Sequence, residues 1–300
     1  MVHRRDFLKS GAAAAGAAVI LGRGELASPR VDLTLGFMIH ALRPEAAKDL
    51  PGTLKRVAEL GYYREIEMVS FKGYGSANAR DGFAPLANMP AAEARKIVQD
   101  AGFRIRSCHF KYLQFETPES TNESVAWAKE LGTEYVTLGD VTPVATRDDW
   151  KRHFDNLNQY GESVAKAGMK LGLHTQNDVW KEFDGELLLD KLLAAVPANH
   201  CQVELDLSST QAMKIDPAMY VRRHPGRVFA LHMRDAKTPT GTGYLPSVPL
   251  GQGDIDWRTL LTACRTANVP HYIVEMQTQG AMDPVLAMKL SAEYLRGLTL

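Results

Sequence analysis

The stretch GRVFALHMRD, residues 226–235, joins an apolar run to three polar groups. The run VFAL is typical of a buried strand, yet His232, Arg234 and Asp235 follow it, and such groups are costly to bury without partners. Polar strand ends are expected where several parallel strands meet at one edge and share a site. The stretch therefore predicts that other strands of this chain end in polar groups as well.

The rest of the chain repeats this strand–helix unit. Apolar runs alternate with longer segments of helical spacing, several of which end at a glycine, as a left-handed helix cap requires (Gly61, Gly102, Gly132 and Gly168). Strands are expected at about 34–39, 64–70, 103–109, 135–140, 169–175, 201–207, 227–233 and 271–277. Eight units over residues 31–300 predict an α/β fold, a single-domain (β/α)8 TIM barrel. A doubly wound open sheet is the alternative, but no G-x-G-x-x-G follows the first run.

Residues 1–30 differ in character from the rest. The stretch MVHRRDFLKSGAAAAGAAVILG places Arg4 and Arg5 before an Ala/Gly-rich apolar run. It resembles a twin-arginine export signal, so we expect export by this route to the periplasm. An amphipathic or disordered N-terminus is the alternative. The run is shorter than the roughly 20 residues that cross a bilayer. Cleavage stays open, because Ala27 is not part of a clear A-x-A site.

Composition excludes some classes of protein. Lys+Arg and Asp+Glu are both 35, so the formal net charge is zero, whereas nucleic-acid binders usually carry a basic excess. The three cysteines form no C-x-x-C pair and do not indicate a disulfide framework. We therefore expect no nucleic-acid partner.

Four consecutive predicted strands offer one metal-binding side chain each at the same end. They are His174, Asp206, His232 and Glu275. Two imidazoles and two carboxylates suit Mn, Fe, Co, Zn or Mg, and without a cation the crowded carboxylates would be unfavourable. The pattern predicts one divalent metal ion. A lone histidine at a strand end is more often structural, so the hypothesis depends on all four together.

Other polar residues are placed by the same strand pattern. His40, Glu67, His109, Asp140, Glu204, Arg234 and Gln277 are expected at the shared mouth. His200 and His271 begin strands and are expected at the opposite face, whereas His153 and His224 lie in helical segments and are expected on the surface. Loops 71–89 and 236–254 also follow strand ends, and the second is a candidate lid over the mouth.

Seven stretches carry a resemblance to a known family. They are GYYREIEM (61–68), SCHF (107–110), LGLHTQN (171–177), VELDLS (203–208), GRVFALHMRD, LGQGDIDW (250–257) and YIVEMQ (272–277). From about 33 to 298 the chain resembles the xylose-isomerase-like barrel superfamily, the sugar phosphate isomerase/epimerase group. The resemblance implies a divalent metal held by His174, Asp206, His232 and Glu275, and substrate contacts from Glu67, His109 and Arg234.

The chain departs from the family pattern at several positions. His174 stands where many sugar isomerases and epimerases have a glutamate, which weakens a mechanism with two symmetric glutamates. Gln176 and Val179 replace a second histidine and a later glutamate of some relatives, and the tryptophan expected after the E-L-D is missing. Arg234 replaces a lysine; arginine clamps carboxylates or diols but stays charged, so it is a poor proton shuttle.

We expect a divalent-metal-dependent sugar isomerase/epimerase that acts on a non-phosphorylated sugar or keto-sugar through a metal-stabilised enediolate. Glu275 or Glu67 is the expected base, His109 the second acid/base, and Asp235 is expected to orient His232 or Arg234. Substrate binding is assigned to His40, Arg234, Glu204, Gln277 and Asn177.

Several alternatives remain open. They are a 3-keto-glycoside lyase or hydrolase on the same site, a non-catalytic sugar-binding barrel and a DNA-repair endonuclease. The endonuclease would need ligands for three zinc ions and a basic face. A homo-oligomer is possible for any of them.

Overall fold

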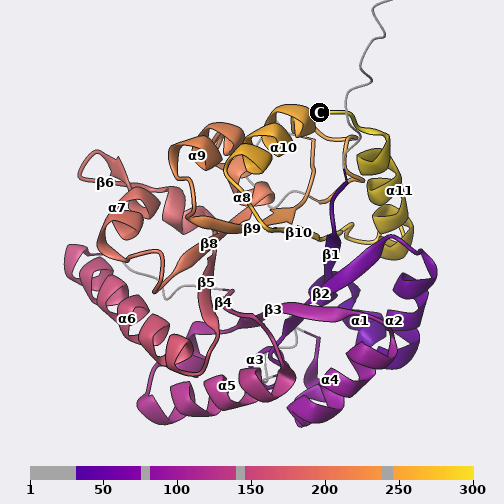
Figure 1. Cartoon of the computed structure of the whole chain (residues 1–300), viewed down its shortest axis with the longest axis horizontal. Coiled ribbons are helices and arrows are strands. Elements are labelled where there is room, and N and C mark those ends of the chain that lie inside the picture. The colour runs from indigo at the N-terminus through magenta and orange to yellow at the C-terminus, as the bar shows by residue number, and fades with distance from the viewer. Residues whose placement is uncertain (1–31, 76–81, 140–145, 238–245) are drawn as a thin grey trace, which may run out of the picture.

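The computed structural model describes residues 32–75, 82–139, 146–237 and 246–300. Its strands form a closed barrel in the order β1-β10-β9-β8-β5-β4-β3-β2 (Figure 1). The strands are β1 (Leu35–Met38), β2 (Tyr63–Val69), β3 (Arg104–Phe110), β4 (Tyr135–Leu138), β5 (Lys170–His174), β8 (Gln202–Asp206), β9 (Val228–Met233) and β10 (His271–Val274). All neighbouring pairs are parallel, so the predicted (β/α)8 barrel and its eight strands are confirmed.

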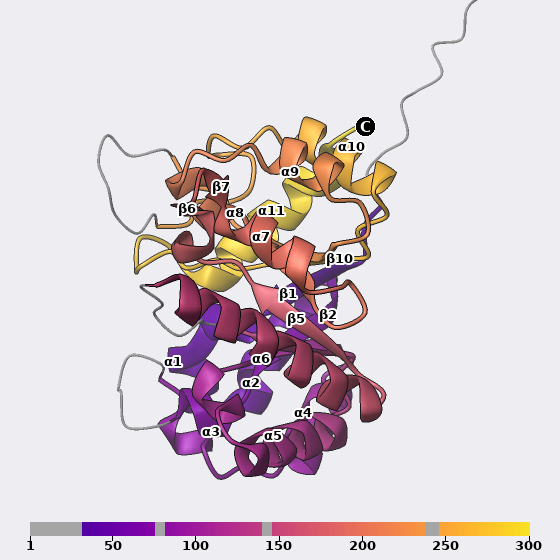
Figure 2. The ribbon, with the colours of Figure 1, turned by 90° about the vertical axis from the view of Figure 1, so that its left-hand side faces the viewer.

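Helices surround the barrel, as the side view shows for α5 and α6 (Figure 2). The α-helices are α1 (Arg43–Ala46), α2 (Leu50–Glu59), α3 (Phe71–Tyr74), α4 (Ala91–Asp100), α5 (Pro118–Leu131), α6 (Arg147–Lys166), α7 (Leu188–Ala195), α8 (Leu207–Ala212), α9 (Pro217–Arg223), α10 (Trp257–Thr266) and α11 (Pro284–Gly297). Short 3-10 turns are η1 (Ile39–Leu42), η2 (Ala84–Leu86), η3 (Tyr112–Phe115) and η4 (Asn177–Trp180), and β6 (Glu182–Phe183) pairs with β7 (Glu186–Leu187). Among the described residues no helix is both long and apolar enough to cross a bilayer.

The predicted glycine caps are present. Gly61, Gly102, Gly132 and Gly168 have φ of 71°, 86°, 82° and 85°, the left-handed conformation that glycine adopts without a Cβ penalty. Each lies between a helix and the strand that follows it. These glycines therefore turn the chain from the outer ring of helices back into the barrel.

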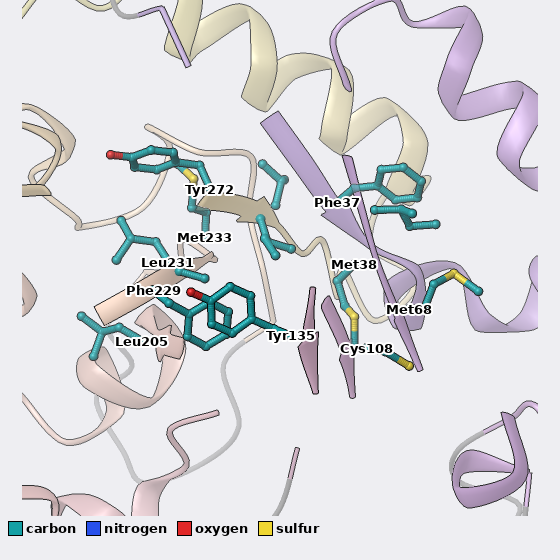
Figure 3. Close-up of a cluster of buried hydrophobic side chains, with 14 of the residues drawn as sticks. Phe37, Met38, Met68, Cys108, Tyr135, Leu205, Phe229, Leu231, Met233 and Tyr272 are labelled. Atoms are coloured by element: carbon teal, nitrogen blue, oxygen red, sulfur yellow. The ribbon is translucent and has the colours of Figure 1, made fainter. Parts of the chain in front are cut away.

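A stacked pair of aromatic rings packs inside the barrel near the amino-terminal ends of β4 and β9. Tyr135 of β4 stacks on Phe229 of β9, with ring centroids 4.0 Å apart and planes at 8° (Figure 3). Gly172 of β5 makes room for this pair, because a Cβ there would lie 2.6 Å from Phe229 Cε1. The interior at this level is thus packed with side chains and is not an open channel.

Register shifts occur in the β1–β2, β2–β3 and β8–β9 pairs, and such a shift changes which side chains face the interior. In the β8–β9 pair, Val203 is opposite Val228 but Glu204 is opposite Ala230. The extra residue, Phe229, resets the alternation, so that both Phe229 and His232 point into the barrel. A similar shift in the β2–β3 pair adds Arg106.

Candidate functional site

A cavity of about 420 Å³ opens at the carboxyl ends of the strands. Most of the residues predicted for the mouth line it: His40, His109, His174, Asn177, Asp206, His232, Arg234, Glu275 and Gln277. Glu67 and Glu204 are fully buried and lie deeper in the barrel than this lining. Asp140 lies outside the described residues, as does 238–245 of the candidate lid.

Three side chains meet at the centre of the mouth and form what we call the outer cluster: His174, Asp206 and His232. His174 Nε2 lies 2.8 Å from His232 Nδ1, and Asp206 Oδ2 lies 3.5 and 3.4 Å from these two nitrogens. One ligand atom of each residue lies within 4.8 Å of the others, and Asp206 Oδ2 is buried without a hydrogen-bond partner. Two nitrogens and one oxygen in this space fit a first-row divalent cation.

The fold orients Asp206 through its position between β8 and α8. Its Oδ1 accepts a hydrogen bond from the backbone N–H of Ser209 at 2.6 Å, which caps the helix. Ser209 Oγ donates to the Asp206 carbonyl and accepts from Trp180 Nε1, at 2.8 and 3.0 Å. The backbone N–H of Asp206 donates to Thr175 Oγ1 at 2.8 Å. These bonds use Oδ1 and leave Oδ2 directed at the two imidazoles.

Glu275 lies on the other side of the His232 ring. Its Oε2 is 3.7 Å from His232 Nε2 and 3.4 Å from Arg234 Nη1. Gln277 Nε2 donates to its Oε1 at 2.6 Å, and His40 Nδ1 is 3.6 Å from the same oxygen. Glu275 is not part of the compact outer cluster, so its predicted role as a fourth metal ligand stays a prediction.

A second group, which we call the inner cluster, consists of Glu67, His109 and Glu204. His109 Nε2 lies 2.7 Å from Glu204 Oε2 and 3.2 Å from Glu67 Oε1. Ser107 Oγ donates a hydrogen bond to the other oxygen of Glu67. His232 Nε2 is 3.6 Å from Glu67 Oε1, so the two clusters touch through this imidazole. All three members of the inner cluster are buried.

Burial and neighbouring charges shift the pKa values of these groups. Burial lowers the pKa of His109, but the carboxylates of Glu67 and Glu204 outweigh it and hold that pKa well above its ordinary value. Burial and the Glu67 charge raise the pKa of Glu204 to about 7. Burial lowers the pKa of His174, which therefore favours the neutral imidazole that a metal requires. The site thus holds both proton donors and proton acceptors near neutral pH.

Lys111 and Gly139 are among the lining residues that were not predicted from the sequence. Lys111 follows β3, and its Nζ lies 4.2 Å from the centre of the Tyr74 ring. Gly139 follows β4, where a Cβ would lie 2.3 Å from Tyr74 Oη and 3.0 Å from His109 Nδ1. Both positions come directly after a strand, which was the available signal, but a lysine or glycine there is common without a role.

Asp235 corrects one expectation. It does not orient His232 or Arg234, because its carboxylate accepts hydrogen bonds from the backbone N–H of Gly251 and from Trp257 Nε1, both at 2.8 Å. Trp257 begins α10 and is buried. Asp235 therefore anchors the LGQGDIDW segment, and the tryptophan of that stretch has a structural explanation.

For the histidines outside the site, the structure confirms some of the predicted locations and corrects others. His271 meets Glu65 at the opposite end of the barrel, with Nδ1 3.6 Å from Oε2, as expected for a residue that begins a strand. His153 was expected on the surface, but it is only 2% exposed and packs against Tyr112 and Trp150. His224 is half-buried, with Nε2 3.0 Å from Asp190 Oδ1. A position in a helix (His153) or just after one (His224) did not show which way these side chains point.

Residues 1–22 match the model of the twin-arginine translocation pathway signal sequence. The expectation of an export signal is confirmed: the chain carries the signal for export by this route.

Solved structures with the same fold include sugar-converting and dehydrating enzymes. A sugar phosphate isomerase/epimerase from Parabacteroides distasonis is 21% identical, with 89% of this chain and 94% of that chain covered and a TM-score of 0.73. A D-psicose 3-epimerase from Clostridium cellulolyticum, solved with D-tagatose, is 14% identical, with 88% and 99% covered and a TM-score of 0.62. A probable 3-DHS dehydratase, AsbF, from Bacillus anthracis is 12% identical, with 88% and 98% covered and a TM-score of 0.64.

At these identities the structures show a shared fold. No curated protein sequence matches the chain. The model of the xylose isomerase-like TIM barrel family matches residues 54–298, which is most of the chain and includes every residue of both clusters. The chain therefore belongs to the xylose isomerase-like TIM barrel family.

Proposed function

We propose that this protein is a divalent-metal-dependent sugar isomerase or epimerase that acts on a non-phosphorylated sugar or keto-sugar. The observation that carries the proposal is the contact between the outer and inner clusters at the cavity floor. His232 Nδ1 faces Asp206 and His174, whereas His232 Nε2 faces Glu67. One imidazole thus connects a group suited to a cation with a group suited to proton transfer.

His174, Asp206 and His232 would hold the metal ion, with Glu275 as the predicted fourth ligand. A divalent ion bound there supplies a Lewis acid that polarises a substrate carbonyl and its neighbouring hydroxyl. Asp206 contributes one oxygen in a fixed direction because its other oxygen caps α8. The neutral form of His174, favoured by burial, keeps its nitrogen lone pair available.

The inner cluster and Glu275 would move the protons. Glu275 is ionised across the neutral range, because burial raises its pKa but His232 and Arg234 lower it further. It can accept a proton from the C–H bond beside a carbonyl. His109, held between Glu67 and Glu204, can return a proton from another direction. Removal and return at one carbon give epimerisation, and return at the neighbouring carbon gives isomerisation.

Polar side chains around the cavity would bind the hydroxyls of the sugar. His40, Arg234, Gln277 and Asn177 line it, and Glu204 supports the floor from below. Among the described lining residues, the permanent cations are Arg234 and Lys111. Arg234 already lies between Asp206 and Glu275, at 3.8 and 3.4 Å. This arrangement favours a neutral sugar over a phosphorylated one.

A lyase or hydrolase acting on 3-keto-glycosides is the second candidate. His174 is the observation that favours it, because an imidazole stands where a symmetric mechanism would place a second carboxylate base. Elimination needs one base and one acid for the leaving group, and Glu275 with His109 supplies that pair. The same first proton transfer serves both candidates, so the products distinguish them.

The test is metal analysis followed by hydrogen exchange. The purified protein should contain about one transition metal per chain by plasma mass spectrometry. In D₂O it should then incorporate deuterium beside the carbonyl of at least one free sugar or keto-glycoside, followed by proton NMR. An epimer or ketose supports the first candidate and an eliminated aglycone the second. No metal uptake on dialysis, with no exchange across the panel, contradicts both and leaves a non-catalytic sugar-binding barrel.

A further inference from the structure

We propose that a side cavity next to the main one binds a second sugar ring, so that the substrate is a glycoside or disaccharide rather than a free monosaccharide. This inference rests on the proposed function and specifies its substrate class. The side cavity has a volume of about 350 Å³ and lies between the segment after β1 and the segment after β10. Its lining includes Arg43, Pro44, Glu45, Gln277, Met282 and Pro284.

The side cavity and the main cavity share a wall. β1 pairs with β10 in the barrel, so the segments that follow these strands lie next to each other at the mouth. Gln277 lines both cavities. Its Nε2 donates to Glu275 Oε1 at 2.6 Å and lies 3.4 Å from His40 Nδ1. A ligand that reaches from the outer cluster past Gln277 would therefore enter the side cavity.

The lining has the chemistry that recognises sugar hydroxyls. Glu45 contributes a carboxylate whose Oε2 is buried without a hydrogen-bond partner. A buried acceptor of this kind is costly, and a ligand hydroxyl that donates to it removes the cost. Arg43 contributes a guanidinium, whose Nη1 donates to the His40 carbonyl at 3.1 Å. Hydroxyls can donate to the carboxylate and accept from the guanidinium.

The rest of the lining supports a neutral ring. Pro44, Met282 and Pro284 provide apolar surface for the C–H face of a sugar. The Glu45 carboxylate offsets the attraction of the Arg43 guanidinium for an anion, so the two charges together do not favour a phosphate. A carboxylate, a guanidinium and an amide beside apolar surface thus suit a hydroxylated ring better than an acidic or wholly apolar one.

The segment after β10 that forms one wall of the side cavity is held in place by its own hydrogen bonds, before any ligand binds. Thr278 Oγ1 donates to the Met282 carbonyl at 2.6 Å, and the backbone N–H of Ala281 donates to the Thr278 carbonyl at 3.0 Å. Gln279 and Gly280 complete this turn with φ of 52° and 83°. A pocket whose shape exists before binding loses less conformational freedom when a ligand enters.

Isothermal titration calorimetry on the metal-loaded protein tests the inference. The probes are D-glucose and four disaccharides that contain it: maltose, cellobiose, trehalose and sucrose. At least one disaccharide should bind about 10-fold more tightly than glucose, the size expected when a hydroxyl satisfies a buried charged acceptor. Glu45→Ala should remove that advantage and leave glucose binding unchanged. Glu59→Ala, an exposed carboxylate on α2, is the matched control and should change neither affinity.

The outcomes separate the two proposals. Equal binding of glucose and all four disaccharides, or equal weakening of both by Glu45→Ala, overturns the side cavity as a sugar site. If deuterium exchange on a free keto-sugar persists in that case, the proposed function stands without it. Absence of binding for every probe, together with absence of exchange, overturns both.

Discussion

Asp206 and Ser209 are joined by a 2.6 Å hydrogen bond from the Ser209 backbone N–H to Asp206 Oδ1. The bond caps α8 and at the same time turns Oδ2 toward His174 and His232. A carboxylate that also caps a helix cannot rotate without uncapping it. The local rule for starting a helix therefore fixes the direction of a candidate metal ligand.

Substitution of Asp206 should separate these two roles. Both Asp206→Asn and Asp206→Ala should lose metal, because neither provides a carboxylate oxygen beside the imidazoles. Asparagine caps a helix about as well as aspartate, so Asp206→Ala should be less stable than Asp206→Asn by about 1 kcal/mol. Plasma mass spectrometry and urea unfolding measure the two effects. Full metal content in Asp206→Asn would remove Asp206 from the ligand set, and equal stability would remove the cap.

Substitution of two other predicted metal ligands, His232 and Glu275, tests whether the four residues bind one metal ion. His232→Ala and Glu275→Ala should each abolish metal retention and leave a folded barrel by circular dichroism. His200→Ala is a matched control, because its Nδ1 pairs with Asn158 Oδ1 at 2.9 Å, and His200 does not line the cavity. Full metal occupancy in both site variants would show that the site is assigned wrongly.

His109→Gln should separate proton transfer from metal binding. His109 contacts Glu67 and Glu204 but is not part of the outer cluster. We expect kcat to fall by roughly 10²- to 10⁴-fold, the usual contribution of a general acid or base, with metal content unchanged. Steady-state kinetics and metal analysis of the same preparation check this. Loss of metal in His109→Gln would instead place His109 in the metal site.

His153 predicts acid sensitivity of the fold. Burial lowers its pKa from 6.5 to about 4. The unfolded chain therefore takes up a proton at a higher pH than the folded one, so this contribution is present above pH 6.5 and is lost as the pH falls toward 4. The loss is roughly 3 kcal/mol. His153→Leu should show a smaller drop in unfolding free energy between pH 7 and pH 4.5 by urea titration. An equal drop in both proteins contradicts the prediction.

Arg4 and Arg5 predict the export route. Replacement of both by lysine keeps the charge of the N-terminus but removes the twin-arginine pair. The protein should then accumulate in the cytoplasm of a bacterial host, whereas the unchanged chain should reach the periplasm. Immunoblots of separated fractions measure this. Periplasmic recovery of the Arg4→Lys, Arg5→Lys variant would mean that another route carries the chain.

Side-chain alternation predicts which residues face the barrel interior only for the part of each strand that follows a register shift. It fails across the shift itself. Period two places His232 on the same face as Ala230 and Val228, which would turn Phe229 outward. The structure instead stacks Phe229 on Tyr135 inside the barrel, because the β8–β9 register shifts by one residue. Nothing local in an apolar strand indicates such a shift, since it is set by pairing with the neighbouring strand.

His153 illustrates a second limit. Its helix is correctly predicted, but the side chain is buried against Tyr112, which belongs to η3, far away in the sequence. A histidine is compatible with either face of an amphipathic helix. Only the packing of η3 against α6 shows which face is inside.

The sequence by itself determined the barrel, its strands, the glycine caps, the export signal and the residues at the mouth. These depend on local properties: apolar periodicity, the φ freedom of glycine, and the tendency of parallel strands to carry polar groups at their carboxyl ends. Tertiary structure alone decided the grouping of those residues into an outer and an inner cluster, the placement of Glu275 across His232, and the use of Asp235 to hold Trp257. Those relations depend on strand register and on contacts between distant segments, which no local pattern encodes.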